Sequence, residues 1–394
     1  MGMRGKRQKP PKEDENILKL PSYITVEILS RLPVKTIILC KAVCKAWRNA
    51  LLDPHFPLIH LAKSSVNLLL CRFPSYWLIE FGKDFRRKKM SKFNDENVHG
   101  VGEPSMVGSC NGLLCLSINY PEDFYVWNPV RNEYVTLPMP NIKAGNRLCS
   151  YSGFGFCPRT DTYKVIRMVR YGSMPSMAWT GSSNQAMCEV YTLGTNTWRT
   201  IEDVPVPHYG GLICKTPFNG AVHWICSFKI NDEKFPLWIC AFKIEDENWA
   251  SILLPLPLLE VPGLEFTDQR KELLLSWLQL GVLDNCLAIF DKSQDSLLNI
   301  WMMKDYGVRE SWIKGWSVES RMPSEIHVPS LLPLKLTKDG DLLMFDDFNK
   351  ALVCFNPQKS MPCKQKISGL PKISKGIAYV ASFISPIKAM KEEC

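Results

Sequence analysis

The sequence predicts a mainly β fold, in which a β-propeller of about six blades follows a small unit of three helices. Three observations support this prediction. Apolar residues recur at helical spacing near the N-terminus, short β-rich runs separated by Gly, Asn, Asp and Pro fill the rest of the chain, and part of the β-rich pattern is repeated. Because the chain has 394 residues, more than a single core usually holds, two units or one large closed repeat are expected.

The helical unit is predicted from spacing and from its breaks. Pro33 ends the first helix, because a proline disrupts a helix interior, and Asp53-Pro54 ends the third. Apolar residues four positions apart share one face of the first helix: Ile24, Ile28 and Leu32. The three helices are expected over residues 20–32, 36–43 and 47–52.

Shifts in composition set the expected domain boundaries. The expected parts are a disordered basic leader over residues 1–17, a helical unit over 18–64, a propeller over 65–388 and a short tail over 389–394.

An aromatic residue recurs near the end of a strand in the β-rich part. The anchors are 64, 51, 48 and 65 residues apart, and they are Trp127, Tyr191, Phe242, Phe290 and Phe355. A kelch-like blade has a period of about 50 residues, so blades with loops of unequal length fit this spacing. Seven blades remain an alternative to six.

Tight turns and a final strand complete the propeller pattern. Asn-Gly and Asp-Gly turns, which favour hairpins because they accept positive φ, occur at Asn111-Gly112, Asn219-Gly220 and Asp339-Gly340. The strand near Ala378–Ile384 is expected to pair with Val66–Cys71 and close the ring.

The fifteen cysteines form no C-x-x-C pair, and the chain has no N-x-[ST] sequon. Both observations favour a reducing compartment, the nucleus or the cytoplasm, with all cysteines as thiols and no metal site. The N-terminus lacks the apolar core of a secretory signal, and the apolar stretches are too short and broken to span a membrane.

The net charge of +9 is concentrated in two basic runs, Arg4–Lys12 and Lys83–Lys92. Such runs bind nucleic acid in some proteins, but here no exposed aromatics alternate with the charges, so a solvated tail and loop are favoured. An acidic protein partner suits the charge equally well. We therefore expect no nucleic acid and no membrane among the partners.

No catalytic constellation is found, and neither an enzyme nor a cofactor is expected. The six histidines are scattered, and His223, within a predicted strand, is interpreted as a hydrogen-bonded structural residue. Asp346-Asp347 follows a strand and is interpreted as a polar turn rather than a hydrolytic carboxylate pair.

The helical unit carries too much apolar surface for its size, which indicates a protein partner or docking onto the propeller. Its pattern resembles the plant F-box, with Leu20-Pro21, Glu27-Ile28-Leu29, Val43-Cys44-Lys45, Trp47-Arg48 and Phe56. This resemblance implies binding to a Skp-type adaptor, and through it to a cullin and a RING subunit. The residues implied in adaptor binding are Leu20, Pro21, Ile24, Ile28, Leu29, Leu32, Pro33, Val43 and Trp47. Many relatives carry a basic and an aromatic residue where this chain has Leu39 and Cys40.

The remaining chain resembles the kelch-like F-box-associated domain of plants, including the S-locus F-box group. The matching segments are 108–113, 126–129, 153–156, 163–165, 190–198 and 220–224. The resemblance implies a non-catalytic receptor that presents a target for ubiquitination and proteasomal degradation; an interaction scaffold outside ligase complexes is the alternative. The target is not identified. The segments Tyr171–Ala186 and Tyr306–Pro329 are expected to be loops that select it; the alternative is that they are disordered or packed on the propeller rim without that role.

Overall fold

A computed structural model of the chain describes residues 20–72, 75–81, 88–94, 104–118, 123–140, 147–171, 185–201, 213–227, 237–255, 258, 277–294, 297–319, 330–356, 363–367 and 375–390. Its contacts divide the chain into two compact units, Met1–Ser64 and Ser65–Cys394. We call their described parts the helical unit and the propeller unit. The predicted leader and residues 391–394 of the predicted tail lie outside the described residues.

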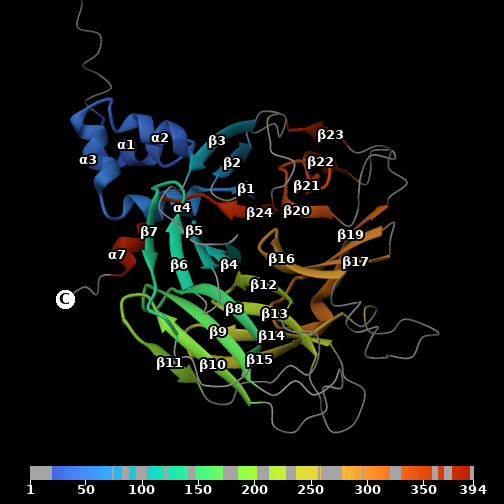
Figure 1. Cartoon of the computed structure of the whole chain (residues 1–394). Coiled ribbons are helices and arrows are strands. Elements are labelled where there is room, and N and C mark those ends of the chain that lie inside the picture. The colour runs from blue at the N-terminus through green and yellow to red at the C-terminus, as the bar shows by residue number, and fades with distance from the viewer. Residues whose placement is uncertain are drawn as a thin grey trace, which may run out of the picture. The chain divides into compact units, whose positions relative to one another are not determined.

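The helical unit contains four helices, one more than the sequence predicts (Figure 1): α1 (Ser22–Leu29), α2 (Val34–Cys40), α3 (Lys45–Leu52) and α4 (Phe56–Lys63). The prediction of three helices was wrong because Asp53-Pro54 ends α3 but not the helical segment. Pro57 lies in the first turn of α4, where a proline is tolerated since its missing N–H would have no helical partner. None of the described helices is long and apolar enough to cross a bilayer.

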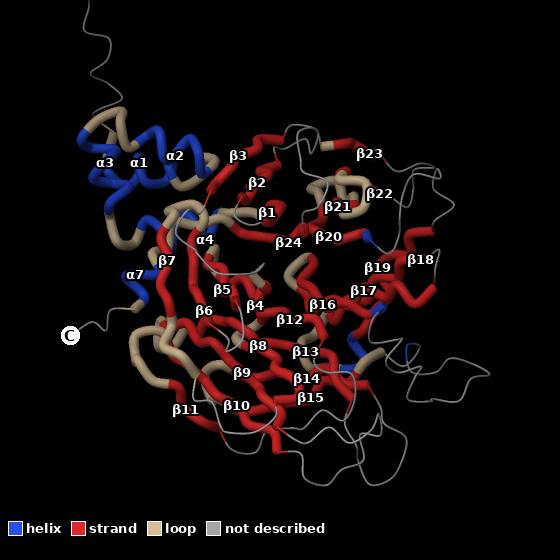
Figure 2. Tube along the Cα trace, viewed as in Figure 1, coloured by secondary structure: helices blue, strands red, loops and turns tan. Residues whose placement is uncertain are grey.

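The described residues of the propeller unit form six four-stranded antiparallel sheets around a common centre (Figures 1 and 2), which confirms the predicted β-propeller. Blades are numbered in chain order, and the first strand named in each lies nearest the centre. Blade 1 is β24 (Lys375–Val380), β1 (Val66–Arg72), β2 (Ser75–Phe81) and β3 (Lys88–Asn94). Blade 2 is β4 (Ser105–Cys110), β5 (Leu113–Ile118), β6 (Asp123–Asn128) and β7 (Glu133–Thr136). Blade 3 is β8 (Arg147–Cys157), β9 (Thr162–Tyr171), β10 (Gln185–Thr192) and β11 (Trp198–Ile201).

The other three blades have the same order. Blade 4 is β12 (Ile213–Phe218), β13 (Ala221–Ser227), β14 (Leu237–Lys243) and β15 (Asn248–Leu253). Blade 5 is β16 (Leu278–Leu283), β17 (Cys286–Gln294), β18 (Leu297–Met303) and β19 (Trp312–Glu319). Blade 6 is β20 (Leu331–Leu336), β21 (Leu342–Asp346), β22 (Ala351–Phe355) and β23 (Cys363–Lys366).

The two ends of the propeller unit meet in blade 1, as the sequence predicts. Strand β24 pairs with β1 in antiparallel register from Val66↔Val380 to Cys71↔Lys375. The segment after β24 then fastens to blade 2, where the Asn128 amide donates to the carbonyls of Ser382 and Ile384 at 3.1 and 2.7 Å. It ends in the short helix α7 (Pro386–Ala389).

Two of the three predicted hairpin turns between first and second strands take the expected conformation; at the third, Asp339-Gly340, only Gly340 has positive φ, at 78°. Asn111-Gly112 and Asn219-Gly220 have positive φ at both residues, which a two-residue hairpin turn requires. Asp284-Asn285 does the same without a glycine, with φ of 50° and 54°, and the sequence search missed this turn.

Two turn glycines form a matched pair for a test of ring closure. Gly112 and Gly220 both have positive φ, but a Cβ on Gly112 would lie 2.3 Å from Ser382 Oγ, whereas a Cβ on Gly220 would meet nothing within 4 Å. Gly220→Ala should therefore cost only the backbone strain, about 1 kcal/mol, and Gly112→Ala at least about 2 kcal/mol more. Chemical denaturation of the two variants measures the difference, and equal unfolding free energies would contradict the contact.

The aromatic anchors pack between blades. Trp127, Tyr191 and Phe242 lie in the third strands of their blades and are fully buried. Phe290 instead lies in β17, the second strand of blade 5, so its place in the anchor series was wrong. The spacing alone could not distinguish these strands because apolar residues occur in both.

His223 is confirmed as a hydrogen-bonded structural residue. Its ring is fully buried, with Nδ1 3.0 Å from the Thr216 carbonyl and Nε2 2.7 Å from the Tyr306 hydroxyl. Because a carbonyl only accepts, Nδ1 carries the proton and Nε2 accepts from Tyr306. Burial lowers the pKa of His223 to about 4. Asp346, the last residue of β21, stabilises the turn that follows, since its carboxylate accepts from Ser330 Oγ and from the N–H groups of Phe348 and Asn349.

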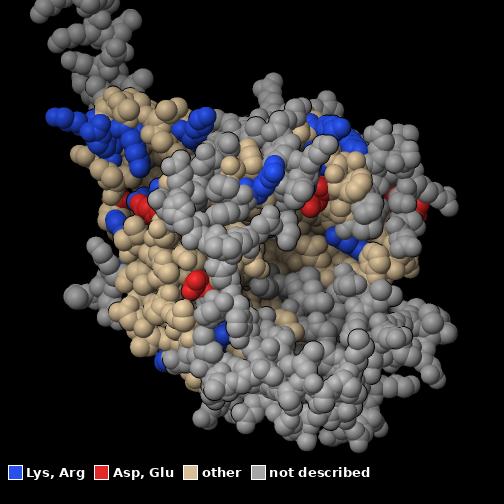
Figure 3. Space-filling view, in the orientation of Figure 1, with Lys and Arg blue, Asp and Glu red and all other residues tan. Residues whose placement is uncertain are grey.

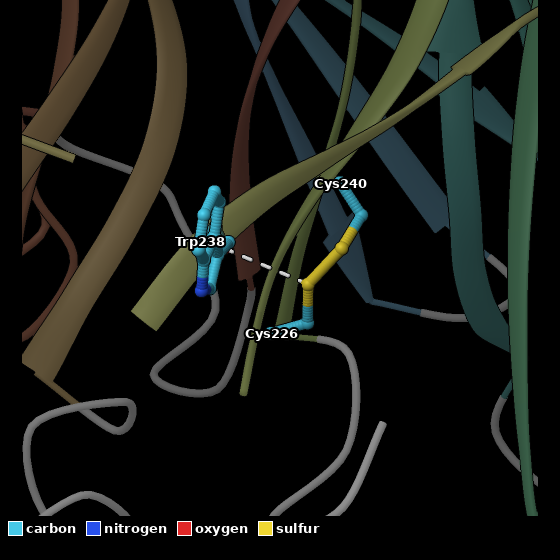
Figure 4. The surroundings of a disulfide bond; sticks show 3 residues. All are labelled: Cys226, Trp238 and Cys240. Atoms are coloured by element: carbon cyan, nitrogen blue, oxygen red, sulfur yellow. Dashed lines mark hydrogen bonds between the residues drawn. A yellow bond between two sulfur atoms is a disulfide. The ribbon is translucent and has the colours of Figure 1, made fainter. Parts of the chain in front are cut away.

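The expectation that all cysteines are thiols was wrong. Cys226 and Cys240 form a disulfide between β13 and β14 (Figure 4), with a sequence separation of 14 and 6.5 Å between Cα atoms. In the strand register Cys226 faces Trp238 and Cys240 faces Trp224, so the cysteines are diagonal neighbours on one sheet face. A search for C-x-x-C spacing cannot detect such a pair.

The two segments expected to be target-selecting loops are partly strand. Trp312–Glu319, within the predicted loop Tyr306–Pro329, is β19 and pairs with β18, so that part of the prediction was wrong. Tyr171 and Ala186 belong to β9 and β10. Residues 172–184 and 320–329 lie outside the described residues, as do residues 83–87 of the second basic run.

Candidate adaptor-binding surface

Much of the apolar surface exposed by the described residues lies on the helical unit. Eight of the fifteen large apolar side chains that are exposed belong to it: Leu20, Tyr23, Ile28, Ile38, Leu39, Val43, Leu52 and Leu58. We call these eight side chains the apolar surface. So many large exposed apolar side chains on one small unit indicate a protein-interaction site.

The geometry of α1 and α2 decides which apolar residues are exposed. In α1 the buried residues are Thr25 and Leu29, one position after the face predicted from Ile24 and Ile28. In α2 Val34, Ile37 and Cys40 point inward at three-residue spacing, so Ile38 and Leu39 point outward.

The sequence-predicted residues fall into three groups. Leu20, Pro21, Ile28, Pro33 and Val43 are exposed; Ile24, Leu32 and Trp47 are half-buried. Leu29 has 0% exposure and belongs to the core of the helical unit, so it supports the surface without forming it. Their assignment to adaptor binding stays a prediction.

The helix ends are fixed by local contacts. Cys44 caps α3, with its Sγ accepting from the Trp47 N–H at 3.4 Å. Arg48 Nε donates to the Lys41 carbonyl at 3.1 Å, which joins α3 to the end of α2. These contacts hold Val43 in the α2–α3 connection, where it is 62% exposed.

Basic side chains gather on the helical unit (Figure 3, upper left). Residues 20–64 contain six Lys and Arg but two acidic residues, Glu27 and Asp53, a net charge of +4. Glu27 pairs with Lys63 and with Arg31, and these two contacts hold the pKa of Glu27 below its ordinary value. Lys35 and Lys45 are exposed and have no ion pair among the described residues, so the charge of this unit suits an acidic partner.

A groove of about 740 Å³ lies between α1, α3 and α4. It is lined by Leu20 just before α1, by Tyr23 of α1, by Ala46 and Ala50 of α3 and by Phe56 of α4. It is large enough to receive side chains of a partner.

Sequence reasoning missed five members of the apolar surface: Tyr23, Ile38, Leu39, Leu52 and Leu58. A signal was present for α2, because three consecutive apolar residues, Ile37-Ile38-Leu39, cannot all face one side of a helix. Cys40, a departure from the family pattern, is buried and acts through packing, whereas Leu39 is exposed.

His60 makes the stability of the helical unit sensitive to pH. Its side chain is buried, and this burial lowers its pKa to about 4. Well above pH 6.5 the His60 ring is neutral in both the folded and the unfolded chain. Between pH 6.5 and 4 the unfolded chain binds a proton at this ring and the folded chain does not. The free energy of unfolding therefore falls as the pH falls. We expect a loss of about 3 kcal/mol over this range.

This loss can be measured by hydrogen exchange of the backbone amides of α1–α4 in the full chain, between pH 7.5 and 4.5. The rates are corrected for the intrinsic pH dependence of exchange, and because only helix amides are followed, the stability of the propeller does not enter. His60→Gln should abolish the dependence, and His55→Gln, at an exposed position before α4, should retain it. A His60→Gln variant with the wild-type slope would contradict the assignment.

The described residues contain no group of three or more His, Cys, Asp or Glu side chains that could hold a metal ion. The arrangement on the helical unit is suited to binding a protein, by apolar contact and by charge.

Comparison with known proteins gives two family matches and a set of plant relatives. The F-box domain matches residues 17–58, and the F-box associated beta propeller domain matches residues 64–382. The F-box protein At3g07870 of Arabidopsis thaliana is 28% identical over 354 residues, covering 82% of this chain and 78% of the relative. The F-box protein CPR1 of Arabidopsis thaliana is 27% identical over 386 residues, covering 93% and 88%. The F-box/kelch-repeat protein At3g23880 of Arabidopsis thaliana is 23% identical over 399 residues, covering 93% and 96%.

These matches confirm the resemblance to plant F-box proteins. The propeller match covers well over half of the chain, and the F-box match covers α1 to α3 and the start of α4. The chain belongs to the family of F-box proteins that carry an F-box associated β-propeller domain.

Proposed function

We propose that the protein is the substrate-recognition subunit of an SCF-type E3 ubiquitin ligase. The helical unit binds a Skp-type adaptor, which connects the chain to a cullin and a RING subunit. The propeller unit binds a protein target for ubiquitination and proteasomal degradation. The observation that carries this proposal is the apolar surface of the helical unit, on the same chain as a closed propeller.

The physical argument concerns size and burial. A unit of about 45 described residues cannot bury all of its apolar side chains by itself, and eight large ones remain exposed. Burial of such side chains against a partner supplies binding free energy, while Lys35 and Lys45 favour encounter with an acidic surface. F-box proteins with propellers are typically non-catalytic adaptors, so the ubiquitin transfer chemistry belongs to the partner subunits.

Reconstitution tests the proposal directly. The full chain, co-expressed with a Skp-type adaptor, a cullin and a RING subunit, should purify as one complex and support ubiquitin transfer onto bound protein when an E1 and an E2 are added. Capture of the adaptor without any cullin would instead favour an interaction scaffold outside ligase complexes. Failure to bind any Skp-type adaptor would contradict the function itself.

The proposed location is the nucleus or the cytoplasm, where the other subunits of such a ligase act. The Cys226–Cys240 disulfide is buried between strands, so thiol reductants would reach it slowly in a reducing compartment. A fluorescent fusion of the full chain tests the location, and accumulation in the secretory pathway would contradict it.

A further inference from the structure

A cavity lies at the centre of the propeller unit, apart from the apolar surface of the helical unit. Its volume is about 620 Å³, and it is walled by first strands of five blades and by the turns Asn111-Gly112 and Asp284-Asn285. The described surface recedes toward the middle of the ring (Figure 3). A cavity of this size accommodates several side chains of a bound segment.

The cavity wall is mainly apolar, and its described lining contains one cation, Lys335. Leu280, Val282, Leu332 and Ile377 contribute apolar groups. Lys335 is half-buried on the same wall, and Asp284, the acidic residue of the lining, is exposed in a turn. The wall therefore combines apolar contact with one positive charge.

Local backbone geometry places Lys335. Strand β20 changes register against β21 between Pro333 and Lys335, so Leu334 is an extra residue that packs between blades 6 and 1. Bulges of this kind redirect the following side chain. The Lys335 ammonium lies 5.2 Å from the centroid of the Phe81 ring, which holds it in position without neutralising its charge.

Lys335 has no ion pair among the described residues. Burial without a counter-charge lowers the pKa of Lys335, which means that its surroundings disfavour the charged form. A carboxylate at the cavity would remove this penalty by pairing with the ammonium.

The first strands also offer backbone groups. β4, β12, β16, β20 and β24 each pair with one neighbour among the described strands, so their other edges face the centre with N–H and C=O groups available to a ligand. An extended peptide can use such groups as well as apolar contacts. A nucleic acid is less suited, because one cation cannot neutralise a row of phosphates.

Resting on the proposed function, we infer that the central cavity binds an extended segment of the target that carries an acidic side chain beside apolar ones, with its carboxylate paired to Lys335. The class of target is thus a protein with an accessible acidic–apolar segment. Target selection then depends on the wall of the central cavity as well as on loops between strands.

Two peptide pools test this inference on the full chain bound to a Skp-type adaptor. The pools share random, apolar-rich flanks of twelve-residue peptides and differ in a central Glu or Gln. We expect the Glu pool to be retained preferentially, and the best Glu peptide to bind at least about tenfold more tightly than its Gln counterpart. Lys335→Met should weaken that peptide by a similar factor, and Lys335→Arg should retain most of the affinity.

Ala378→Trp is a second variant that does not touch Lys335. Ala378 is exposed on the cavity wall in β24, so a large side chain there fills the cavity without disturbing the core. It should abolish peptide binding and leave the melting temperature unchanged. Binding of glutarate alone is measured as well, because a site for small carboxylates would bind glutarate and a site for a peptide segment would not.

The outcomes separate this inference from the proposed function. Equal retention of the Glu and Gln pools, full binding by Lys335→Met, or binding of glutarate without any peptide would overturn the inference. In each of those cases the chain would still bind the adaptor and the cullin. Loss of adaptor binding by the unmodified chain would contradict the proposed function while leaving the peptide measurement on the chain alone intact.

Discussion

Removal of residues 375–394 is expected to unfold the propeller unit. The deletion removes β24, the innermost strand of blade 1, and leaves β1 paired with β2 alone. It also removes the Tyr379 hydroxyl, which donates to the Gly112 carbonyl at 2.7 Å, and the carbonyls that the buried Asn128 amide binds. Because a typical domain is stable by only about 5–15 kcal/mol, loss of a whole inner strand and these contacts should unfold the unit, and limited proteolysis should degrade the truncated chain rapidly.

A shorter deletion provides the control. Removal of residues 391–394 keeps every described strand and helix and should leave proteolysis and the melting temperature unchanged. A synthetic peptide of residues 375–390, added in trans, should restore protection because it supplies β24 and the segment bound to blade 2. A truncated chain that melts at the same temperature as the full chain would contradict ring closure by β24.

The propeller was predictable from sequence because its signals are local. Asn-Gly turns need positive φ, and the two found at Asn111 and Asn219 adopt it. The closing strand could be inferred because a propeller with open edges would leave strands unpaired. Phe290 was misplaced, since an aromatic residue at a strand end does not reveal which strand of the blade it occupies.

The apolar excess of the helical unit was predictable from the sequence, but the identity of its exposed residues was not. Spacing indicated the face with Ile24 and Ile28, whereas packing against α3 buries Thr25 and Leu29. The choice between adjacent faces of a short, apolar helix depends on tertiary contacts that the sequence does not display. The Cys226–Cys240 disulfide was missed for the same reason: the partners meet only through the β13–β14 register.

Replacement of both Leu39 and Val43 by Asp is expected to abolish adaptor binding. The two side chains are 64% and 62% exposed on the apolar surface, at the end of α2 and in the connection to α3. Because truncation of a hot-spot side chain near an interface centre costs about 2 kcal/mol or more, and burial of an unpaired carboxylate adds to that cost, affinity should fall at least about 100-fold. Titration calorimetry of the full chain with a Skp-type adaptor measures the change.

The same substitution at an equally exposed residue of the other unit separates interface loss from a general effect of charge. Phe348, 72% exposed in the turn between β21 and β22, is the control, and Phe348→Asp should bind the adaptor with wild-type affinity. Since neither Leu39 nor Val43 is buried, the double variant should melt like the wild type. Leu20, Pro21 and Ile24, replaced together by Ala, test the α1 end of the surface. Undiminished binding by both the double and the triple variant would remove the helical unit as the adaptor site.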